Sequence, residues 1–247
     1  MSIAAISTAF LCAATLLSGG ESQSLRILPL GDSITQGGRG DREEWTYRHP
    51  LFGLLTDAGV NFDFIGSLKT GLDPKAKWPD YKGKAFDVDH EGHYGWKTAA
   101  VRDKLAEWMK TYPAPADIVL IHLGTNDQDA PDHARAVVEP LREMIAMLRG
   151  KNPNVVVLLA HLNFNDGAAL KIRPLVEALA NEVSTEASPV ATVAMYEGWK
   201  EDPKDPATDT FDWAHPNPQG QRKLAEKWFA AMKPYLEKLQ KSAPAGK

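Results

Sequence analysis

The chain has 247 residues, of which 43% are apolar and 24% are charged. These values are ordinary for a soluble globular protein with one large domain or two small ones. The net charge is −4 at pH 7, and the lysine and arginine residues are scattered among acidic ones. Because a nucleic-acid-binding surface needs a basic patch or stripe, the composition argues against a nucleic-acid partner.

The first twenty residues differ in kind from the rest. Residues 3–17 are apolar or small and carry no charge, and Ser18-Gly19-Gly20 follows them. This pattern predicts a signal peptide over residues 1–20, so we expect a secreted or periplasmic protein. The run is shorter than the roughly 20 apolar residues that a transmembrane helix needs, and we expect no stable membrane span in the mature chain. An uncleaved anchor or a frayed helix is the alternative.

Five short apolar runs in the rest of the chain predict strands, at residues 25–30, 62–66, 118–123, 155–159 and 190–195. Nearly continuous runs of valine, isoleucine and leucine are typical of strands that are buried on both faces of a parallel sheet. Helical spacing appears between the strands, with apolar residues at 137, 141, 145 and 148 and again at 170, 175, 176 and 179.

The last helix has the clearest start. Asn217 suits its N-cap and Pro218 its first position, and the predicted buried stripe is Leu224, Trp228 and Met232. Alternating strands and helices predict a doubly wound α/β fold with a parallel sheet. We expect residues 21–247 to form a single domain and a monomer, with a frayed tail from about residue 242.

The segment from Lys69 to His93 shows no clear period and mixes proline, glycine, charged and aromatic residues. Loops of this length in compact domains are usually functional or disordered. In an open α/β sheet, ligands bind beyond the carboxyl ends of the strands. We therefore expect this loop to contribute to a ligand site, where Trp78 and Tyr81 stack on sugars. Packing of these rings onto the core is the alternative.

The motif Gly31-Asp32-Ser33-Ile34-Thr35 follows the first predicted strand directly. A serine at a strand-to-helix turn presents its hydroxyl to the site while its N–H points inward, as a serine nucleophile requires. An ordinary Asp/Ser helix cap is the alternative interpretation of the same residues.

Asp212 and His215 lie just before the last predicted helix. The aspartate can fold back to accept a hydrogen bond from the imidazole Nδ1–H, which leaves Nε2 to take a proton from a serine. Pro216 biases His215 away from helical geometry and keeps the pair on an extended loop. Taken in isolation, a surface aspartate and a capping-region histidine would be the simpler explanation.

Two further segments offer hydrogen-bond donors. Asn126 follows the third predicted strand in Gly124-Thr125-Asn126-Asp127, and its amide can donate to a developing oxyanion. Gly95 lies in the run from Glu91 to Trp96, where a glycine N–H would add a second donor. Both residues are also compatible with ordinary turns.

The four segments occur in the order and context of SGNH (GDSL-type) hydrolases, and the chain resembles that family from about residue 25 to residue 236. Its signature residue types are present as Ser33, Gly95, Asn126 and His215. The resemblance implies a flavodoxin-like sheet of five parallel strands and an ester-hydrolysing site without a cofactor. It also implies that Ser33 is the nucleophile, that Asp212 and His215 complete the triad, and that Ser33, Gly95 and Asn126 form the oxyanion hole.

Within the family, the chain looks most like acetylesterases that act on plant polysaccharides, such as acetylxylan esterases. The features that carry this resemblance are Tyr47-Arg48, residues 64–67, residues 89–96 and residues 212–217. One departure is Tyr94, which stands beside the oxyanion glycine where a smaller residue is common in similar sequences.

We therefore expect a serine esterase whose partner is an acylated carbohydrate. The residues assigned to substrate binding are Asp32, Tyr94, Trp96 and Trp213. A lipid or thioester hydrolase of the same fold is one alternative, but it would need an apolar groove, and the loops are polar. A non-catalytic sugar-binding domain is the other.

Metal and thiol chemistry is not expected. The single cysteine, Cys12, lies inside the predicted signal peptide, so the mature chain would hold no disulfide or catalytic thiol. One acidic and histidine-containing run could suggest a metal site, namely Asp87, Asp89, His90, Glu91 and His93. A His-x-x-His pair on a loop is a weak signal, and the family resemblance explains the run without metal.

Overall fold

The computed structural model describes residues 24–242. The predicted signal peptide, residues 1–20, and the chain end after residue 242 lie outside the described residues, so both stay predictions. Within residues 24–242, no helix is both long and apolar enough to cross a membrane.

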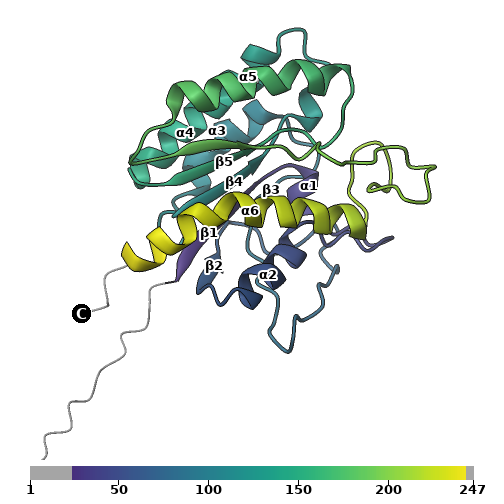
Figure 1. The fold of residues 1–247 in the computed structure, drawn as a ribbon, viewed down its shortest axis with the longest axis horizontal. Helices are drawn as coiled ribbons and strands as arrows, with labels where there is room; N and C mark the ends of the chain where they lie inside the picture. The colour runs from purple at the N-terminus through teal and green to yellow at the C-terminus, as the bar shows by residue number, and fades with distance from the viewer. Residues whose placement is uncertain (1–23, 243–247) are drawn as a thin grey trace, which may run out of the picture.

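A parallel sheet forms the centre of the fold (Figure 1). Neighbouring strands all run parallel, so the predicted five-stranded parallel α/β sheet is confirmed. The structure adds a two-residue strand, β3 (Glu91–Gly92), which pairs with the end of β1. In the order β2-β1-β4-β5-β6, the main strands are β2 (Phe62–Phe64), β1 (Leu25–Gly31), β4 (Ile118–His122), β5 (Val156–Ala160) and β6 (Val190–Val193).

The direction in which successive strands are added to the sheet changes at β1. β2 lies on one side of β1, and the chain then returns to place β4 on the other side. β2 pairs only with the first half of β1, whereas β3 pairs with Leu30 and Gly31 at its end. In open parallel sheets such a switch point leaves a crevice at the carboxyl ends of the strands, where ligands bind.

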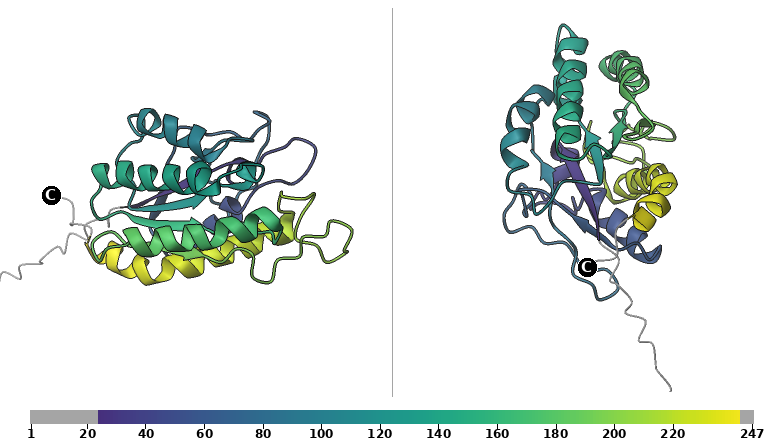
Figure 2. Two further views of the ribbon diagram at one scale, coloured as in Figure 1. Left: turned by 90° about the horizontal axis from the view of Figure 1, so that it is seen from above. Right: turned by 90° about the vertical axis from the view of Figure 1, so that its left-hand side faces the viewer.

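Helices cover both faces of the sheet (Figures 1 and 2). One face packs against α3 (Thr98–Trp108), α4 (Glu139–Lys151) and α5 (Gly167–Val183), and the other against α2 (Arg48–Asp57) and α6 (Pro218–Ser242). The strands serve both layers because successive side chains point to opposite faces. β4 and β5 are accordingly buried along their whole length, as continuous apolar runs predict.

α6 begins and packs as the sequence predicts. The side-chain oxygen of Asn217 accepts hydrogen bonds at 3.0 Å from the N–H groups of residues 219 and 220. Leu224, Trp228 and Met232 are fully buried. The cap and the buried stripe together place the start of α6 directly behind the loop that carries Asp212 and His215.

The helix predicted from apolar spacing at residues 170–179 is present as α5, but not all of those apolar residues are buried. Val176 and Leu179 are buried, but Leu170 is 52% exposed. The inward face begins at Ala169 and continues through Ile172, at the spacing of three and four residues that an amphipathic helix requires. Leu170 is one position after Ala169, which turns its side chain about 100° away from the core.

The long loop before β3 is fastened to the α2 side of the molecule. The indole N–H of Trp78 donates to the carbonyl oxygen of Trp45 at 2.9 Å, and the ring packs against the core. The hydroxyl of Tyr81 donates to the carboxylate of Asp57 at 2.7 Å. For Trp78, packing onto the core is therefore the better interpretation.

Two leucines of α5 give a matched test of its orientation. Leu179→Ala should lower the free energy of unfolding by about 2–5 kcal/mol, because it leaves a cavity in the core. Leu170→Ala should change it by less than about 0.5 kcal/mol, because that side chain is half exposed. Urea denaturation measures both values, and equal losses would contradict the observed packing.

Candidate active site

Ser33 lies in the tight turn between β1 and α1 (Ser33–Gln36). Asp32 caps this short helix, since its Oδ1 accepts from the Ile34 N–H at 2.9 Å. Gly31 permits the close approach of β4, because a Cβ at this position would lie 2.6 Å from the carbonyl oxygen of His122. The turn therefore presents Ser33 at the switch point of the sheet.

A buried arginine holds the other end of α1. The guanidinium of Arg48 donates to the carbonyl oxygens of Thr35 at 2.8 Å and of Gln36 and Val88 at 3.0 Å. The last carbonyl groups of a helix have no intrahelical partner, and a cation stabilises them. Burial lowers the pKa of Arg48 to about 10, so the side chain remains charged at neutral pH.

Ser33, His215 and Asp212 form an unbroken hydrogen-bonded row. Nε2 of His215 lies 2.9 Å from Oγ of Ser33, and Nδ1 lies 3.0 Å from each carboxylate oxygen of Asp212. The serine and the histidine are 182 positions apart in the sequence. The fold brings them together because α1 and the loop before α6 meet at the same edge of the sheet.

The turn from Asp212 to His215 closes on itself. Oδ1 of Asp212 accepts from the N–H groups of Ala214 at 3.0 Å and His215 at 2.9 Å. Burial opposes ionisation of Asp212, but these N–H groups and the adjacent imidazole hold its pKa well below the usual range. A charged Asp212 fixes the proton on Nδ1 of His215 and leaves Nε2 to act as a base toward Ser33.

The loop after β3 brings Gly95 beside α1. Gly95 is exposed and has a φ of 78°, a left-handed conformation that favours glycine. The preceding N–H, that of Tyr94, donates to Oε1 of Gln36 at 2.7 Å, which ties this loop to the helix of the serine. The loop that carries Gly95 is therefore held beside α1, the helix that begins at Ser33.

Asn126 reaches the same edge from the turn after β4. Its Nδ2 donates to the carbonyl oxygen of Trp96 at 2.9 Å, which uses one of the two amide hydrogens. The N–H of Ser33 opens α1 and has no acceptor within that helix. Ser33, Gly95 and Asn126 thus lie on three separate elements at this edge, and the oxyanion hole that they are expected to form stays a prediction.

The aromatic residues assigned to substrate binding have different surroundings. Trp213 is 58% exposed next to Asp212 and leans edge-on against Phe164. The ring of Tyr94 stacks on His215, with centroids 5.2 Å apart. Trp96 is half-buried and packs against the apolar core beneath α3. Trp213 therefore offers the most open flat surface of the three for a ligand.

Asp32 does not suit the substrate-binding role that we expected. Its side chain is fully buried, so a substrate has no surface of it to contact. Oδ1 caps α1, and Oδ2 has no hydrogen-bond partner among the described residues. Burial raises the pKa of Asp32 to about 7. Because Asp32 is buried and caps α1, we assign it to stabilising that helix and not to contact with substrate.

The acidic and histidine-containing run around β3 is satisfied by protein partners. Glu91 is buried and accepts from the hydroxyl of Tyr112 at 2.6 Å, from Ser67 and from Nε2 of His93. Both ring nitrogens of His90 are hydrogen-bonded to backbone atoms, and burial lowers its pKa well below the usual range. Among residues 24–242 no three histidine, cysteine or acidic residues are placed to hold a metal ion.

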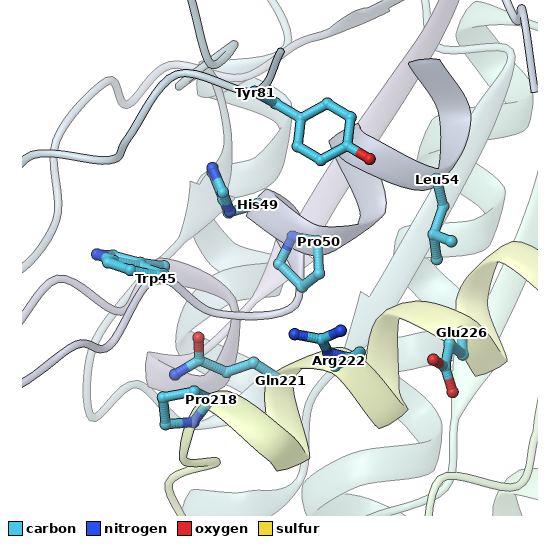
Figure 3. Close-up of a pocket in the computed structure, with 9 residues that line it drawn as sticks. All are labelled: Trp45, His49, Pro50, Leu54, Tyr81, Pro218, Gln221, Arg222 and Glu226. Atoms are coloured by element: carbon cyan, nitrogen blue, oxygen red, sulfur yellow. The ribbon is translucent and has the colours of Figure 1, made fainter. Parts of the chain in front are cut away.

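A separate pocket opens between the first turns of α2 and α6 (Figure 3). Its volume is about 290 Å³, and its lining includes Trp45, Tyr81 and Arg222 but no residue of the hydrogen-bonded row. The ring of Tyr81, expected to stack on a sugar, lines this pocket.

The roles of Gln36 and Arg48 cannot be predicted from the sequence motifs. Both act on backbone atoms of other segments, and no short motif encodes such contacts. The pair Tyr47-Arg48 was a feature of the family resemblance, which was the one available signal for Arg48.

The pKa of Asp32 leads to a test of stability. Since the folded protein keeps this proton to about pH 7 and an unfolded aspartate loses it near pH 4, stability should fall as the pH rises between these values. Asp32→Asn keeps an oxygen for the Ile34 N–H and removes the charge. Its stability relative to the wild type should rise by about 3 kcal/mol from pH 5 to pH 8.

Urea denaturation at the two pH values gives this difference. Asp103→Asn is the control, because Asp103 is an exposed residue of α3 paired with Arg102. A constant difference between Asp32→Asn and the wild type would contradict the buried, protonated state of Asp32.

The known proteins to which this chain is similar include esterases and acylhydrolases, and ester hydrolysis is a reaction that such a row of serine, histidine and aspartate performs. Residues 30–223 match the GDSL-like lipase/acylhydrolase family. A multidomain esterase of Ruminococcus flavefaciens is 26% identical in an alignment of 240 residues that covers 87% of this chain. The matched part is only 29% of that esterase, so the chain spans less than a third of its length.

Solved structures share the fold. An acetyl esterase mutant with a bound acetate ion has a TM-score of 0.70 and 24% identity, over 87% of this chain and 99% of the other. A family 3 carbohydrate esterase of Clostridium thermocellum has a TM-score of 0.68 and 26% identity, over 88% and 100%. Since the family match covers most of the chain and includes Ser33, Asn126 and His215, the protein belongs to the GDSL-like lipase/acylhydrolase family of SGNH hydrolases.

Proposed function

We propose that this protein is a serine esterase that removes O-acetyl groups from carbohydrates, and that it is exported from the cytoplasm. The observation that carries the proposal is the hydrogen-bonded row of Ser33, His215 and Asp212. Serine acyl transfer needs this arrangement of nucleophile, base and orienting carboxylate. The apolar first twenty residues support export.

In the acylation step, Oγ of Ser33 attacks the ester carbonyl carbon while Nε2 of His215 takes the hydroxyl proton. The carbonyl oxygen becomes an oxyanion, to which Ser33, Gly95 and Asn126 donate hydrogen bonds. Collapse of this intermediate breaks the bond to the sugar oxygen. That oxygen leaves with the proton held by His215, and Ser33 keeps the acyl group as an ester.

Deacylation repeats the sequence with water. His215 removes a proton from a water molecule, whose oxygen attacks the acyl carbon and regenerates the oxyanion. The bond to Oγ of Ser33 then breaks, and the imidazolium returns its proton to the serine. A carboxylic acid leaves and the free enzyme is restored, so the cycle needs no cofactor.

Several observations support an acetylated sugar as the substrate. The exposed ring of Trp213 gives a sugar face a place to stack beside the triad. The ring of Tyr94 stacks on His215, and we infer that so large a side chain beside Gly95 leaves room only for a short acyl group. The two structural relatives described above are an acetyl esterase and a carbohydrate esterase, at 24% and 26% identity.

Asn126 provides a test of the oxyanion hole. Asn126→Ala should lower kcat by about 10²–10³ with a smaller effect on KM, because the hydrogen bond strengthens only in the transition state. Steady-state kinetics with 4-nitrophenyl acetate measures both constants. An unchanged kcat would remove Asn126 from the oxyanion hole.

The substrate class is tested by comparing acyl lengths and glycans. We expect kcat/KM to fall from 4-nitrophenyl acetate through butyrate to octanoate, together with acetate release from acetylated xylan. An apolar acyl groove would instead reward each added methylene by about 0.8 kcal/mol. Ser33→Ala should abolish both reactions in a folded protein.

A matched variant separates sugar recognition from ester chemistry. Trp213→Ala should reduce acetate release from acetylated xylan more than it reduces hydrolysis of 4-nitrophenyl acetate, because only the glycan has a sugar to stack. A rising series toward octanoate, without release from any acetylated glycan, would refute the carbohydrate assignment and favour a lipid hydrolase.

A further inference from the structure

A second ion pair lies behind the catalytic carboxylate. Nη1 of Arg42 donates to Oδ2 of Asp212 at 3.1 Å, while Nε and Nη2 each donate to a carboxylate oxygen of Glu44 at 3.3 Å. The guanidinium carbon lies 4.6 Å from the ring centroid of Phe211. Arg42 is thus held on three sides, by two carboxylates and an aromatic face.

This arrangement is not a loose surface contact. The side chain of Arg42 is 16% exposed and that of Glu44 is 2% exposed. The backbone around them is fastened as well, since the carbonyl oxygen of Glu44 accepts from the Gly38 N–H at 2.7 Å. The neighbouring carbonyl, of Glu43, accepts from the Gln221 amide of α6 at 3.0 Å. Ion pairs held in this way contribute more than exposed ones, whose side chains move freely.

We propose that Arg42 is a positioning residue that holds the carboxylate of Asp212 toward His215, and that Arg42 and Glu44 together set the pH range in which His215 acts as a base. The proposal rests on the triad of the proposed function, but it does not depend on which ester is the substrate.

The geometry explains the positioning role. Oδ1 of Asp212 is fixed by two backbone N–H groups in addition to His215. Oδ2 has only His215 and Arg42 as hydrogen-bond donors among the described residues. Arg42 therefore prevents the carboxylate from rotating about its last bond, which keeps both oxygens at 3.0 Å from Nδ1.

The charges explain the effect on pH range. A cation beside Asp212 disfavours the imidazolium form of His215, whereas an anion favours it. Burial opposes the charge on Arg42, but Glu44 and then Asp212 raise its pKa, so the guanidinium stays charged. Removing Arg42 should make His215 easier to protonate, and removing the charge of Glu44 should make it harder.

The other groups near His215 do not reverse these signs. Ser33 is its neutral hydrogen-bond partner. Tyr94, stacked on the imidazole, stays neutral because burial and then Glu44 raise the pKa of its hydroxyl above the ordinary value for tyrosine. Arg39 approaches the Tyr94 hydroxyl and pairs with Asp41, and its charge is unchanged in the variants below.

The test is the pH dependence of kcat/KM with 4-nitrophenyl acetate, whose acidic limb reports the base of the free enzyme. Arg42→Gln should move this limb to higher pH by about 0.5–1 unit and lower kcat about tenfold. Glu44→Gln should move it to lower pH. Arg42→Lys keeps the charge, so its limb should stay nearer the wild type. Arg142→Gln, which removes a cation from an exposed pair with Glu182, should not move it.

Opposite shifts in the two glutamine variants would support the proposal, because a purely structural defect lowers the rate without moving the limb in two directions. If the acidic limb of the kcat/KM profile stays in place in folded variants, or moves in the same direction in both glutamine variants, the proposal is overturned. If Arg42→Gln does not fold, the other two variants still test the proposal. Glu44→Gln must move the limb to lower pH, and Arg42→Lys must leave it near the wild type. Full activity of Ser33→Ala would instead refute the proposed triad.

Discussion

The close approach of three backbone segments at the end of β1 is the constraint on which the site depends. Gly31 lies against the carbonyl oxygen of His122 on β4, and Gly92 lies against the backbone of Gln36 in α1. Neither position has room for a Cβ. Because these segments touch, the serine of α1, the glycine loop after β3 and the asparagine turn after β4 all lie at the same end of the sheet. A side chain at either glycine would force these backbone segments apart.

Buried polar groups fasten these segments to one another. Arg48 binds two carbonyl oxygens at the end of α1 and that of Val88 in the loop before β3, and Glu91 accepts four hydrogen bonds from the segments around β3. Asp32 caps α1 at the cost of a buried carboxyl group with a raised pKa. Burying such groups costs free energy unless they are fully hydrogen-bonded. The fold accepts this cost around the nucleophile, where precise positions matter most for catalysis.

The triad lies between two layers of different chemistry. On the open side, Tyr94 and Trp213 provide aromatic faces. On the protein side, Arg42 and Glu44 form an ionic layer behind Asp212. The first layer suits contact with a sugar ester and the second suits control of the charge on the His–Asp pair. The segment that carries Arg42 comes directly before α2, and its attachment to α6 couples the two helices to the catalytic loop.

The sequence by itself determined the parts of this protein whose geometry is local. Strands buried on both faces need continuous apolar runs, and the turn from Asp212 to His215 closes within four residues. The capped start of α6 is local for the same reason. Ser33, Asp212 and His215 could be proposed because each lies in a short motif with its own backbone requirement.

Only the tertiary structure decided which side chains meet across the chain. Arg42 reaches Asp212 over 170 positions, and Arg48 reaches Val88 over 40. Burial was also settled by packing: Asp32 lies under α1 instead of at the surface, and Leu170 faces solvent although it is apolar. A motif specifies the chain's local path, but exposure and long-range contacts depend on what packs against it, and that is a property of the whole fold.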